Sequence, residues 1–278
     1  MNTVPFGVSR LDSLVDGGAP QGSVVLLASE SGAGGREFLY TSAVMNTIAR
    51  IDEELFELHY GELAGDATPP PEVHYVSFTA DEAYLTRQMG FTMDPELVDR
   101  AAEQIRFADL SREYFHPSPV PREWYLGETS ALRDLGTRQE HDDVLEAFGT
   151  YLSEHATDSL VVIDSVTDLV AAVSDETTWS DIALVLKGLS KAAHQWGGLI
   201  LLLVNRETLE DGELGLLKDA VDGTFCFEWE SGGSKRARTM VVQEFRGVLS
   251  RLEDENIVQF ETEIHDGGFD ISDIRKIR

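Results

Sequence analysis

The chain alternates between short apolar runs and stretches with helical periodicity, and this alternation constrains its fold more than any other feature. Residues 23–28, 73–78 and 160–163 are apolar runs of strand length. Continuous runs of this kind are typical of strands that are buried on both faces of a parallel sheet. Helical spacing follows them, from about residue 36 and again over about 181–196. The pattern predicts an α/β, three-layer fold with a mostly parallel central sheet.

After residue 221 the helical pattern stops. Three strand-like runs follow, at 225–229, 239–246 and 257–264, and turns are expected around the glycine pairs 232–233 and 267–268. We interpret them as antiparallel strands that extend the parallel sheet. The whole chain, 1–278, is expected to form one domain. Two Pro-containing segments without a clear period are expected to be loop insertions, at 61–72 and 111–137.

The composition is strongly acidic. Fifty Asp and Glu stand against 22 Lys and Arg, only five of which are lysines, and the net charge is −28. At molar salt the Debye length falls to about 3 Å, so the self-repulsion of such a surface is screened. We interpret the acidity as that of a halophilic protein in a salt-rich cytoplasm. The alternative is an acidic surface that binds a basic protein.

The sequence shows no pattern typical of a membrane span or of a secretory signal, and it contains a single cysteine. Because no apolar run reaches about 18 residues, no membrane span is expected. The first residues do not resemble a secretory signal, so a cytoplasmic protein is expected. Cys226 is the single cysteine, which excludes an internal disulfide and a cysteine-based zinc cluster. Its apolar neighbours predict a buried thiol.

The segment between the first strand and its helix reads S-E-S-G-A-G-G-R, residues 29–36. A phosphate-binding P-loop has the form G-x-x-x-x-G-K-[ST] in this position. Gly34 matches the second glycine, whereas Ser29 replaces the first, Gly35 replaces the lysine and Arg36 replaces the hydroxyl residue. The candidate phosphate-binding residues are Ser31, Gly32, Ala33, Gly34, Gly35 and Arg36. Taken alone, the segment is equally consistent with an ordinary glycine-rich turn.

The replacements remove specific chemistry. The P-loop lysine bridges the β- and γ-phosphates, and the hydroxyl ligates Mg²⁺. Gly35 offers only its amide, and a guanidinium such as that of Arg36 cannot ligate a cation. Glu30 and Glu37 add negative charge where a triphosphate would lie. We therefore expect one of the chain's own carboxylates to occupy part of the anion cradle.

Motifs along the whole chain resemble the KaiC-type family of RecA-like ATPases. They are F-G-V-S-R-L-D-S-L at 6–14, G-G-A-P-Q-G-S at 17–23, Asp164-Ser165 after a buried run, V-D-G at 221–223, E-F-R-G at 244–247 and G-G-F-D-I at 267–271. The resemblance implies a RecA-like fold, ATP as the ligand and Asp164 as the Walker B acid.

The departures from this family fall at its chemistry. The family carries an acidic pair after the second strand, where this chain has Thr79 and Ala80, and the following Asp81 is expected to cap the next helix. The family's K-x-R-G lysine is replaced by Glu244, while Arg246 remains. We therefore predict a pseudo-ATPase with negligible hydrolysis and no catalytic residue. Binding of ATP or another nucleotide stays open, and Mg²⁺ is not expected.

A basic cluster stands out in the acidic chain. Lys235, Arg236 and Arg238 are predicted to lie in a hairpin loop. A solvated turn is the simplest interpretation of the cluster, and contact with DNA is another. With Arg246, these residues match the region that faces a neighbouring subunit in ring-forming relatives, so an inter-subunit contact is a separate hypothesis. Segment 207–222 is too acidic for phosphate contacts, although its leucines 214, 216 and 217 could pack on a partner.

Three functions are consistent with these features. The first is a non-hydrolysing regulatory or assembly module that associates with itself or with a protein partner. The second is an active ATPase in which Arg36 replaces the P-loop lysine. The third is a recombination-accessory protein that binds DNA. No metal-ligand spacing occurs among the seven histidines, and Ser165 lacks the sequence context of a nucleophile.

Overall fold

A computed structural model describes residues 2–125, 144–173, 178–231, 236–245, 248, 252 and 257–276. Within these residues, nine strands form one sheet in the order β11-β10-β9-β8-β3-β7-β6-β4-β5, and β1 and β2 form a small separate ribbon. The strands are β1 Thr3–Val4, β2 Ala19–Pro20, β3 Ser23–Ser29, β4 Val73–Ser77, β5 Arg106–Asp109, β6 Leu160–Asp164, β7 Leu199–Asn205, β8 Gly223–Ser231, β9 Arg236–Phe245, β10 Ile257–His265 and β11 Gly268–Lys276.

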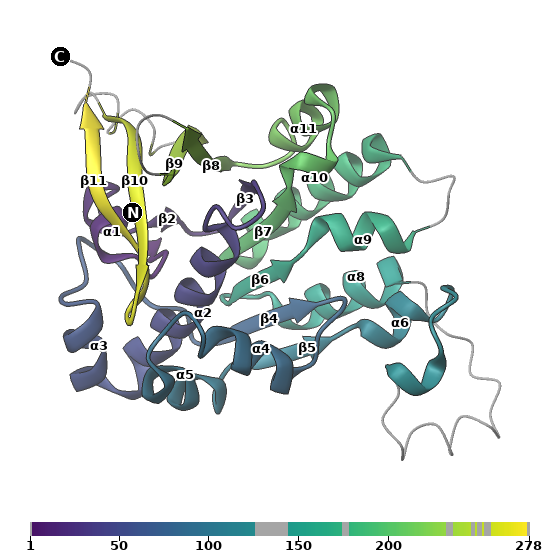
Figure 1. Ribbon diagram of the computed structural model, residues 1–278, viewed down its shortest axis with the longest axis horizontal. Coiled ribbons are helices and arrows are strands. Elements are labelled where there is room, and N and C mark those ends of the chain that lie inside the picture. Colours follow the sequence, from purple (N-terminus) through teal and green to yellow (C-terminus); the bar gives the residue numbers. More distant parts are fainter. Residues whose placement is uncertain are drawn as a thin grey trace.

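Helices cover both faces of this sheet, giving three layers (Figure 1). The helices are α1 Ser9–Leu14, α2 Gly35–Ile51, α3 Glu53–His59, α4 Glu82–Met89, α5 Pro95–Ala102, α6 Ser111–Phe115, α8 Val144–His155, α9 Val166–Ala172, α10 Trp179–Trp196 and α11 Asp211–Lys218, with short 3₁₀ turns η1 Arg122–Trp124 and η2 Arg206–Thr208. One core lies on the side of α2, α4 and α5, and the other on the side of α8, α10 and α11. The predicted α/β architecture is confirmed.

The sheet changes from parallel to antiparallel at β8. From β3 to β5 in the sheet order above, the neighbours β3, β7, β6, β4 and β5 pair in parallel. Strand β8 is parallel to β3, and β9, β10 and β11 follow as antiparallel neighbours. The predicted extension after residue 221 is therefore correct. Because the parallel strands share one direction, the chain segments that leave β3, β4, β6 and β7 meet at one edge of the sheet.

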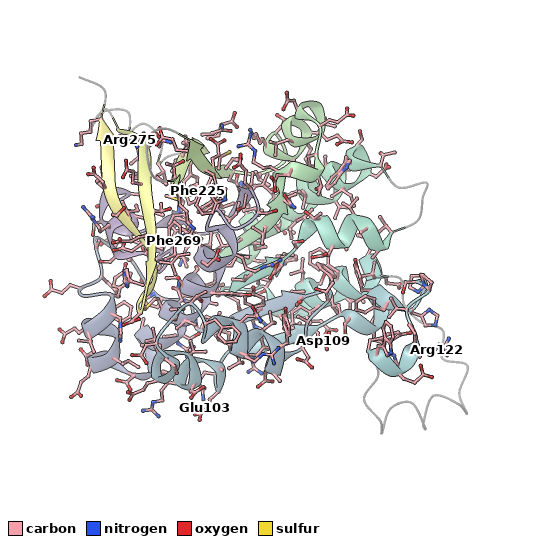
Figure 2. The ribbon with its side chains drawn as sticks, viewed as in Figure 1. Glu103, Asp109, Arg122, Phe225, Phe269 and Arg275 are labelled. Atoms are coloured by element: carbon pink, nitrogen blue, oxygen red, sulfur yellow. The ribbon has the colours of Figure 1, made fainter. Side chains whose placement is uncertain are left out.

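Helix α2 is the most buried helix, and aromatic rings surround its first turns. The ring of Phe38 lies 5.4–6.0 Å from those of Phe6, Phe225, Phe227 and Phe269. These partners come from the N-terminal segment and from β8 and β11 (Phe225 and Phe269 are labelled in Figure 2). The antiparallel strands thus help to fix the start of α2, where the glycine-rich segment ends.

A buried carboxylate fixes the N-terminal segment. Asp12 accepts hydrogen bonds from the amides of Phe6 and Gly7, at 2.7 and 3.0 Å, and from the hydroxyl of Tyr60 at 2.9 Å. Burial raises the pKa of Asp12 from 3.8 to about 7, although the three donors act to lower it. The contacts explain why an acidic residue is present at a fully buried position.

Several elements differ from the sequence-based predictions. Segment 111–137 was predicted to be irregular, but Ser111–Phe115 is helical because the Asp109 carboxylate accepts from the Ser111 amide and Tyr114 packs on the core. The rest of that segment is irregular up to residue 121, and residues 126–143 lie outside the described part. Residues 61–72 hold no helix or strand. Leu214 and Leu217 pack in the chain's own core, so the expectation that they contact a partner is wrong.

No described helix has both the length and the apolar character needed to cross a membrane. The thiol of Cys226 is buried, as predicted.

Candidate functional site

A cavity of about 440 Å³ opens where the parallel strands end. Residues of the 29–36 loop form one wall, together with Asp164 of β6 and Asn205 of β7. The opposite wall includes Tyr84 of α4 and Phe91, which follows that helix. Most of the predicted phosphate-binding residues, namely Ser31, Gly32, Gly34, Gly35 and Arg36, therefore line one cavity with Asp164, whereas Ala33 is buried in the core.

The loop can follow its path only because of its glycines. Gly34 has a φ of +113°, in the region that favours glycine, and a Cβ there would lie 3.0 Å from the ring of Phe269. At Gly35, a Cβ would lie 2.6 Å from the Cβ of Ser29 and 2.8 Å from its hydroxyl oxygen. A lysine therefore does not fit at position 35 while a serine occupies position 29. The two replacements in the P-loop pattern depend on each other.

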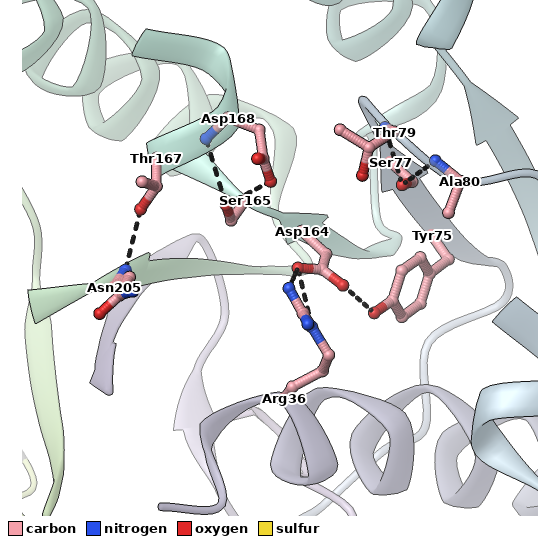
Figure 3. A network of polar contacts seen from close by, with 10 residues as sticks. All are labelled: Arg36, Tyr75, Ser77, Thr79, Ala80, Asp164, Ser165, Thr167, Asp168 and Asn205. Atoms are coloured by element: carbon pink, nitrogen blue, oxygen red, sulfur yellow. Dashed lines mark hydrogen bonds and ion pairs between the residues drawn. The ribbon is translucent and has the colours of Figure 1, made fainter. Parts of the chain in front are cut away.

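Arg36 is directed at Asp164, the last residue of β6 (Figure 3). Its Nη2 and Nε lie 3.0 and 3.3 Å from Oδ1 of Asp164. The hydroxyl of Tyr75, from β4, donates to the other oxygen, Oδ2, at 3.0 Å. Both carboxylate oxygens of Asp164 are thus bound by donors of the protein itself.

The contact joins a buried carboxylate to a guanidinium that is half exposed. The side chain of Asp164 is only 7% exposed, while that of Arg36 is 54% exposed. The Asp164 carboxylate raises the pKa of Arg36 further above its ordinary value. Burial raises the pKa of Tyr75 well above 10, so its hydroxyl keeps the proton that it donates. A buried carboxylate needs such compensation, and here a guanidinium supplies it.

The outer side of the loop is held by residues that come from distant parts of the chain. Glu207 of η2 accepts from the amide of Ser31 at 3.0 Å and from its hydroxyl at 2.6 Å. The indole of Trp229 donates to the Ser31 carbonyl, and Arg238 Nε donates to the Gly32 carbonyl, both at 3.0 Å. These contacts turn the polar groups of residues 31–32 toward protein partners.

One of the chain's own carboxylates, Glu207, binds a loop amide, but it does so from the outer side of the loop, so the expected occupation of the anion cradle stays a prediction. Glu30 accepts from the Trp229 amide at 3.0 Å and lines the cavity. Glu37 lines the cavity from the first turn of α2. Glu207 could not be predicted, because it lies 176 residues from Ser31 in the sequence.

The positions of the family's acidic pair carry no carboxylate. The amides of Thr79 and Ala80 donate to the Ser77 hydroxyl, at 3.4 and 3.1 Å. Asp81 accepts from the Tyr84 amide at 2.8 Å and caps α4, which confirms its predicted role. Ser165 caps α9 through the Asp168 amide and donates to the Asp168 carboxylate. Nothing in these contacts activates Ser165 as a nucleophile.

Two residues of the predicted basic cluster lie in a strand and not in a loop. Arg236 and Arg238 belong to β9, because the hairpin strand begins earlier than the apolar pattern indicated. The Arg238 guanidinium lies 4.8 Å from the Trp229 ring, in addition to its bond to Gly32. Lys235, Arg246 and the side chain of Arg236 lie outside the described residues. Within the described residues, no group of three His, Cys, Asp or Glu is placed to hold a metal ion.

The comparisons with known proteins agree with this geometry at the level of fold. No family model matches the chain, and no curated protein does. Among solved structures, a KaiC-like protein from Pyrococcus horikoshii OT3 is 17% identical, with a TM-score of 0.62 over 98% of this chain and 99% of that chain. The flagellar accessory protein FlaH from Methanocaldococcus jannaschii is 14% identical, with a TM-score of 0.54 over 96% of each chain. The chain therefore has the RecA-like fold of the KaiC-like proteins.

Proposed function

We propose that this chain is a RecA-like protein with a degenerate nucleotide site, which acts as a non-hydrolysing regulatory or assembly module. The observation that carries the proposal is the Arg36–Asp164 ion pair. A side chain of the protein neutralises the carboxylate that a RecA-like ATPase would use toward its metal.

The residues present do not fit Mg²⁺. Magnesium requires oxygen ligands in near-octahedral geometry. Asp164 has both oxygens occupied, by Arg36 and by Tyr75, and position 36 has no hydroxyl. A cation placed beside Asp164 would also face the positive charge of Arg36.

The remaining groups do not support phosphoryl transfer. Such catalysis is almost entirely positioning and electrostatic stabilisation, and loss of a single stabilising donor can cost about 10²–10³ in rate. This site lacks the lysine at position 35 and carboxylates at 79 and 80. The competing hypothesis, an ATPase that uses Arg36 as its lysine, requires Arg36 to leave Asp164. That move would strand a buried carboxylate without a counter-charge.

Binding without hydrolysis is still compatible with the site. The first backbone amides of α2 lie at the end of the helix that borders the cavity, where they favour an anion. The guanidinium of Arg36, whose side chain is 54% exposed, adds positive charge there. If a nucleotide binds here, its affinity should not depend on Mg²⁺. The intramolecular contacts of Arg238 and the acidic residues around α11 favour a protein partner or a second copy over DNA.

ATP turnover by the purified chain in molar KCl tests the proposal. We expect wild type and Asp164→Asn to give the same background rate. The matched gain-of-function control is the triple variant Ser29→Gly, Gly35→Lys, Arg36→Thr, which removes the obstacle at position 35 and restores a P-loop. We expect Mg²⁺-dependent nucleotide binding only in this variant. Steady turnover by wild type that Asp164→Asn abolishes would show that the proposal is wrong.

A further inference from the structure

Three side chains from the first turns of α2 present two opposite charges and a hydroxyl to the cavity. Arg36, Glu37 and Tyr40 all line it. Tyr40 lies three positions after Glu37 and four after Arg36, so its side chain is a neighbour of each on the helix surface. A guanidinium, a carboxylate and a phenol hydroxyl are therefore within reach of a single small molecule.

The hydroxyl of Tyr40 is a donor without an acceptor. Tyr40 is only 4% exposed, and no hydrogen bond among the described residues satisfies its hydroxyl. Burial raises the pKa of Tyr40 above its ordinary value of 10, and the nearby Asp164 acts in the same direction, so the hydroxyl keeps its proton. Because buried polar groups are normally paired, this hydroxyl at the cavity wall points to a ligand with an acceptor.

Further donors line the same cavity. Ser77 is 2% exposed, and its oxygen accepts from two backbone amides, while no group in the described part of the chain accepts its own proton. The first residue before α2 is Gly34, which has no side chain to cap the helix, so the amides of residues 35–37 have no capping acceptor. A carboxylate, which has two acceptor oxygens, suits this set of donors.

An anion alone does not suit the charge of the cavity. Of its charged lining residues, Arg36 is basic, while Glu30, Glu37 and Asp164 are acidic. Asp164 is paired with Arg36, and Glu30 accepts from the amide of Trp229. The carboxylate of Glu37 has no such partner among the residues that the structure describes. A triphosphate would meet this excess of negative charge, whereas an ammonium group beside a carboxylate would neutralise Glu37.

The opposite wall of the cavity is apolar and aromatic. It includes Leu85, Tyr84 and Phe91, which we define as the aromatic wall. Leu85 is buried, but Tyr84 and Phe91 are 48% and 74% exposed. The guanidinium of Arg87 lies 5.5 Å from the centre of the Tyr84 ring and supports it. An apolar or aromatic ligand side chain would cover these rings and gain their packing energy.

We infer that the cavity binds a free α-amino acid with an apolar or aromatic side chain. Its carboxylate accepts from Arg36, from Tyr40 and from the first amides of α2. Its ammonium group pairs with Glu37, and its side chain packs on the aromatic wall. The inference names the ligand of the proposed regulatory module and rests on that proposal, because it requires Arg36 to stay paired with Asp164 and leaves no place for a metal ion.

A matched set of ligands tests the inference on the wild-type chain. L-phenylalanine has both charged groups and a ring, whereas phenethylamine lacks the carboxylate, 3-phenylpropionate lacks the ammonium group and glycine lacks the side chain. Ligand-observed NMR titrations of the full chain in molar KCl give the dissociation constants. Each incomplete ligand should bind about tenfold or more weakly than L-phenylalanine, since each loses one of the three sets of contacts.

Two variants assign the charged groups of the ligand to their partners. Glu37→Gln should weaken L-phenylalanine about tenfold and should not weaken 3-phenylpropionate, since only the ammonium group contacts residue 37. Tyr40→Phe should weaken L-phenylalanine and 3-phenylpropionate but not phenethylamine. Glu53→Gln on α3 removes the same charge as Glu37→Gln outside the cavity, and as the control it should change no affinity. Circular dichroism verifies that each variant is folded.

The outcomes separate this inference from the proposed function. Folded wild type that does not bind L-phenylalanine, or that binds the complete and incomplete ligands equally, would overturn the inference, and ATP turnover would stay at background. An effect of Glu53→Gln as large as that of Glu37→Gln would also overturn it. Steady ATP turnover that Asp164→Asn abolishes would overturn the proposed function and this inference with it.

Discussion

Single residues decide whether the 29–36 loop can hold a lysine. Ser29 and Gly35 face each other, and a side chain at both positions would bring two Cβ atoms to 2.6 Å. Position 29 therefore carries a side chain and position 35 does not. Arg36 and Asp164 both line the cavity, and they are bound to each other there.

Gly35→Ala should destabilise the protein by about 1–3 kcal/mol, because the new methyl group overpacks against Ser29. Adding Ser29→Gly should recover most of this loss, and the coupling can be read from a double-mutant cycle of urea unfolding in KCl. Gly149→Ala is the control, since open space surrounds that position in α8 and alanine should stabilise the helix by about 0.5–1 kcal/mol. Additive effects of the two loop changes would contradict the steric explanation.

Asp12 should make stability depend on pH in an unusual direction. Its folded pKa of about 7 lies above the unfolded value of 3.8, so the native state binds the proton more tightly. Its contribution to stability is complete below about pH 4 and is lost as pH rises to about 7, at up to about 1.4 kcal/mol per pH unit. The free energy of unfolding of wild type, relative to Asp12→Asn, should therefore fall over this range. A relative stability that rises with pH would show that the three donors to Asp12 outweigh burial.

The sequence indicated where the 29–36 loop departs from the P-loop pattern, but not which contacts surround it. Gly35 and Arg36 could be identified because a P-loop has fixed spacing after a strand. Tyr75 gave a weak signal, since a tyrosine in a buried strand needs a partner for its hydroxyl. Glu207 and Trp229 gave none, because they reach Ser31 through the sheet, from positions 176 and 198 residues away.

At the scale of elements, the antiparallel strands hold the glycine-rich loop. Trp229 of β8 contacts Ser31 and Glu30, and Arg238 of β9 stacks on Trp229 and bonds to Gly32. In this arrangement β8 and β9 act as a clamp on the loop. The loop is consequently held by contacts within the protein.

Trp229→Ala should loosen this clamp, because it removes the indole donor to Ser31 and the surface on which Arg238 stacks. Hydrogen exchange should become faster at the amides of residues 30–34, with little change in α10. Trp124→Ala is the matched control, since Trp124 is exposed and distant in sequence from the loop contacts. Unchanged exchange at 30–34 in Trp229→Ala would contradict the proposed clamp.

Element predictions succeeded where periodicity was long and failed where it was short. The runs of β3, β6 and β7 and the stripe of α10 gave clear patterns. Helices α5, α9 and α11 have only seven or eight residues, so their periodicity was too short to distinguish from a loop. Helix α6 was missed because prolines follow it closely and dominate the pattern.

At the scale of the whole molecule, the architecture followed from alternation of strand and helix patterns, and the surface charge followed from composition. The order of the strands in the sheet could not be predicted, because nothing in the sequence states which parallel strands are neighbours.

The net charge of −28 should make stability depend strongly on salt. We expect the thermal midpoint to rise as KCl increases toward molar concentration. A midpoint that does not change with KCl would contradict the interpretation of the acidity.

The central claim is that Arg36 has taken the place of a metal ion at Asp164. Calorimetric titration of wild type with ATP in molar KCl, with and without Mg²⁺, tests it most directly. The account predicts that the two titrations coincide, whether both show binding or neither does. Binding that appears only with Mg²⁺, and that disappears in Asp164→Asn, would contradict it.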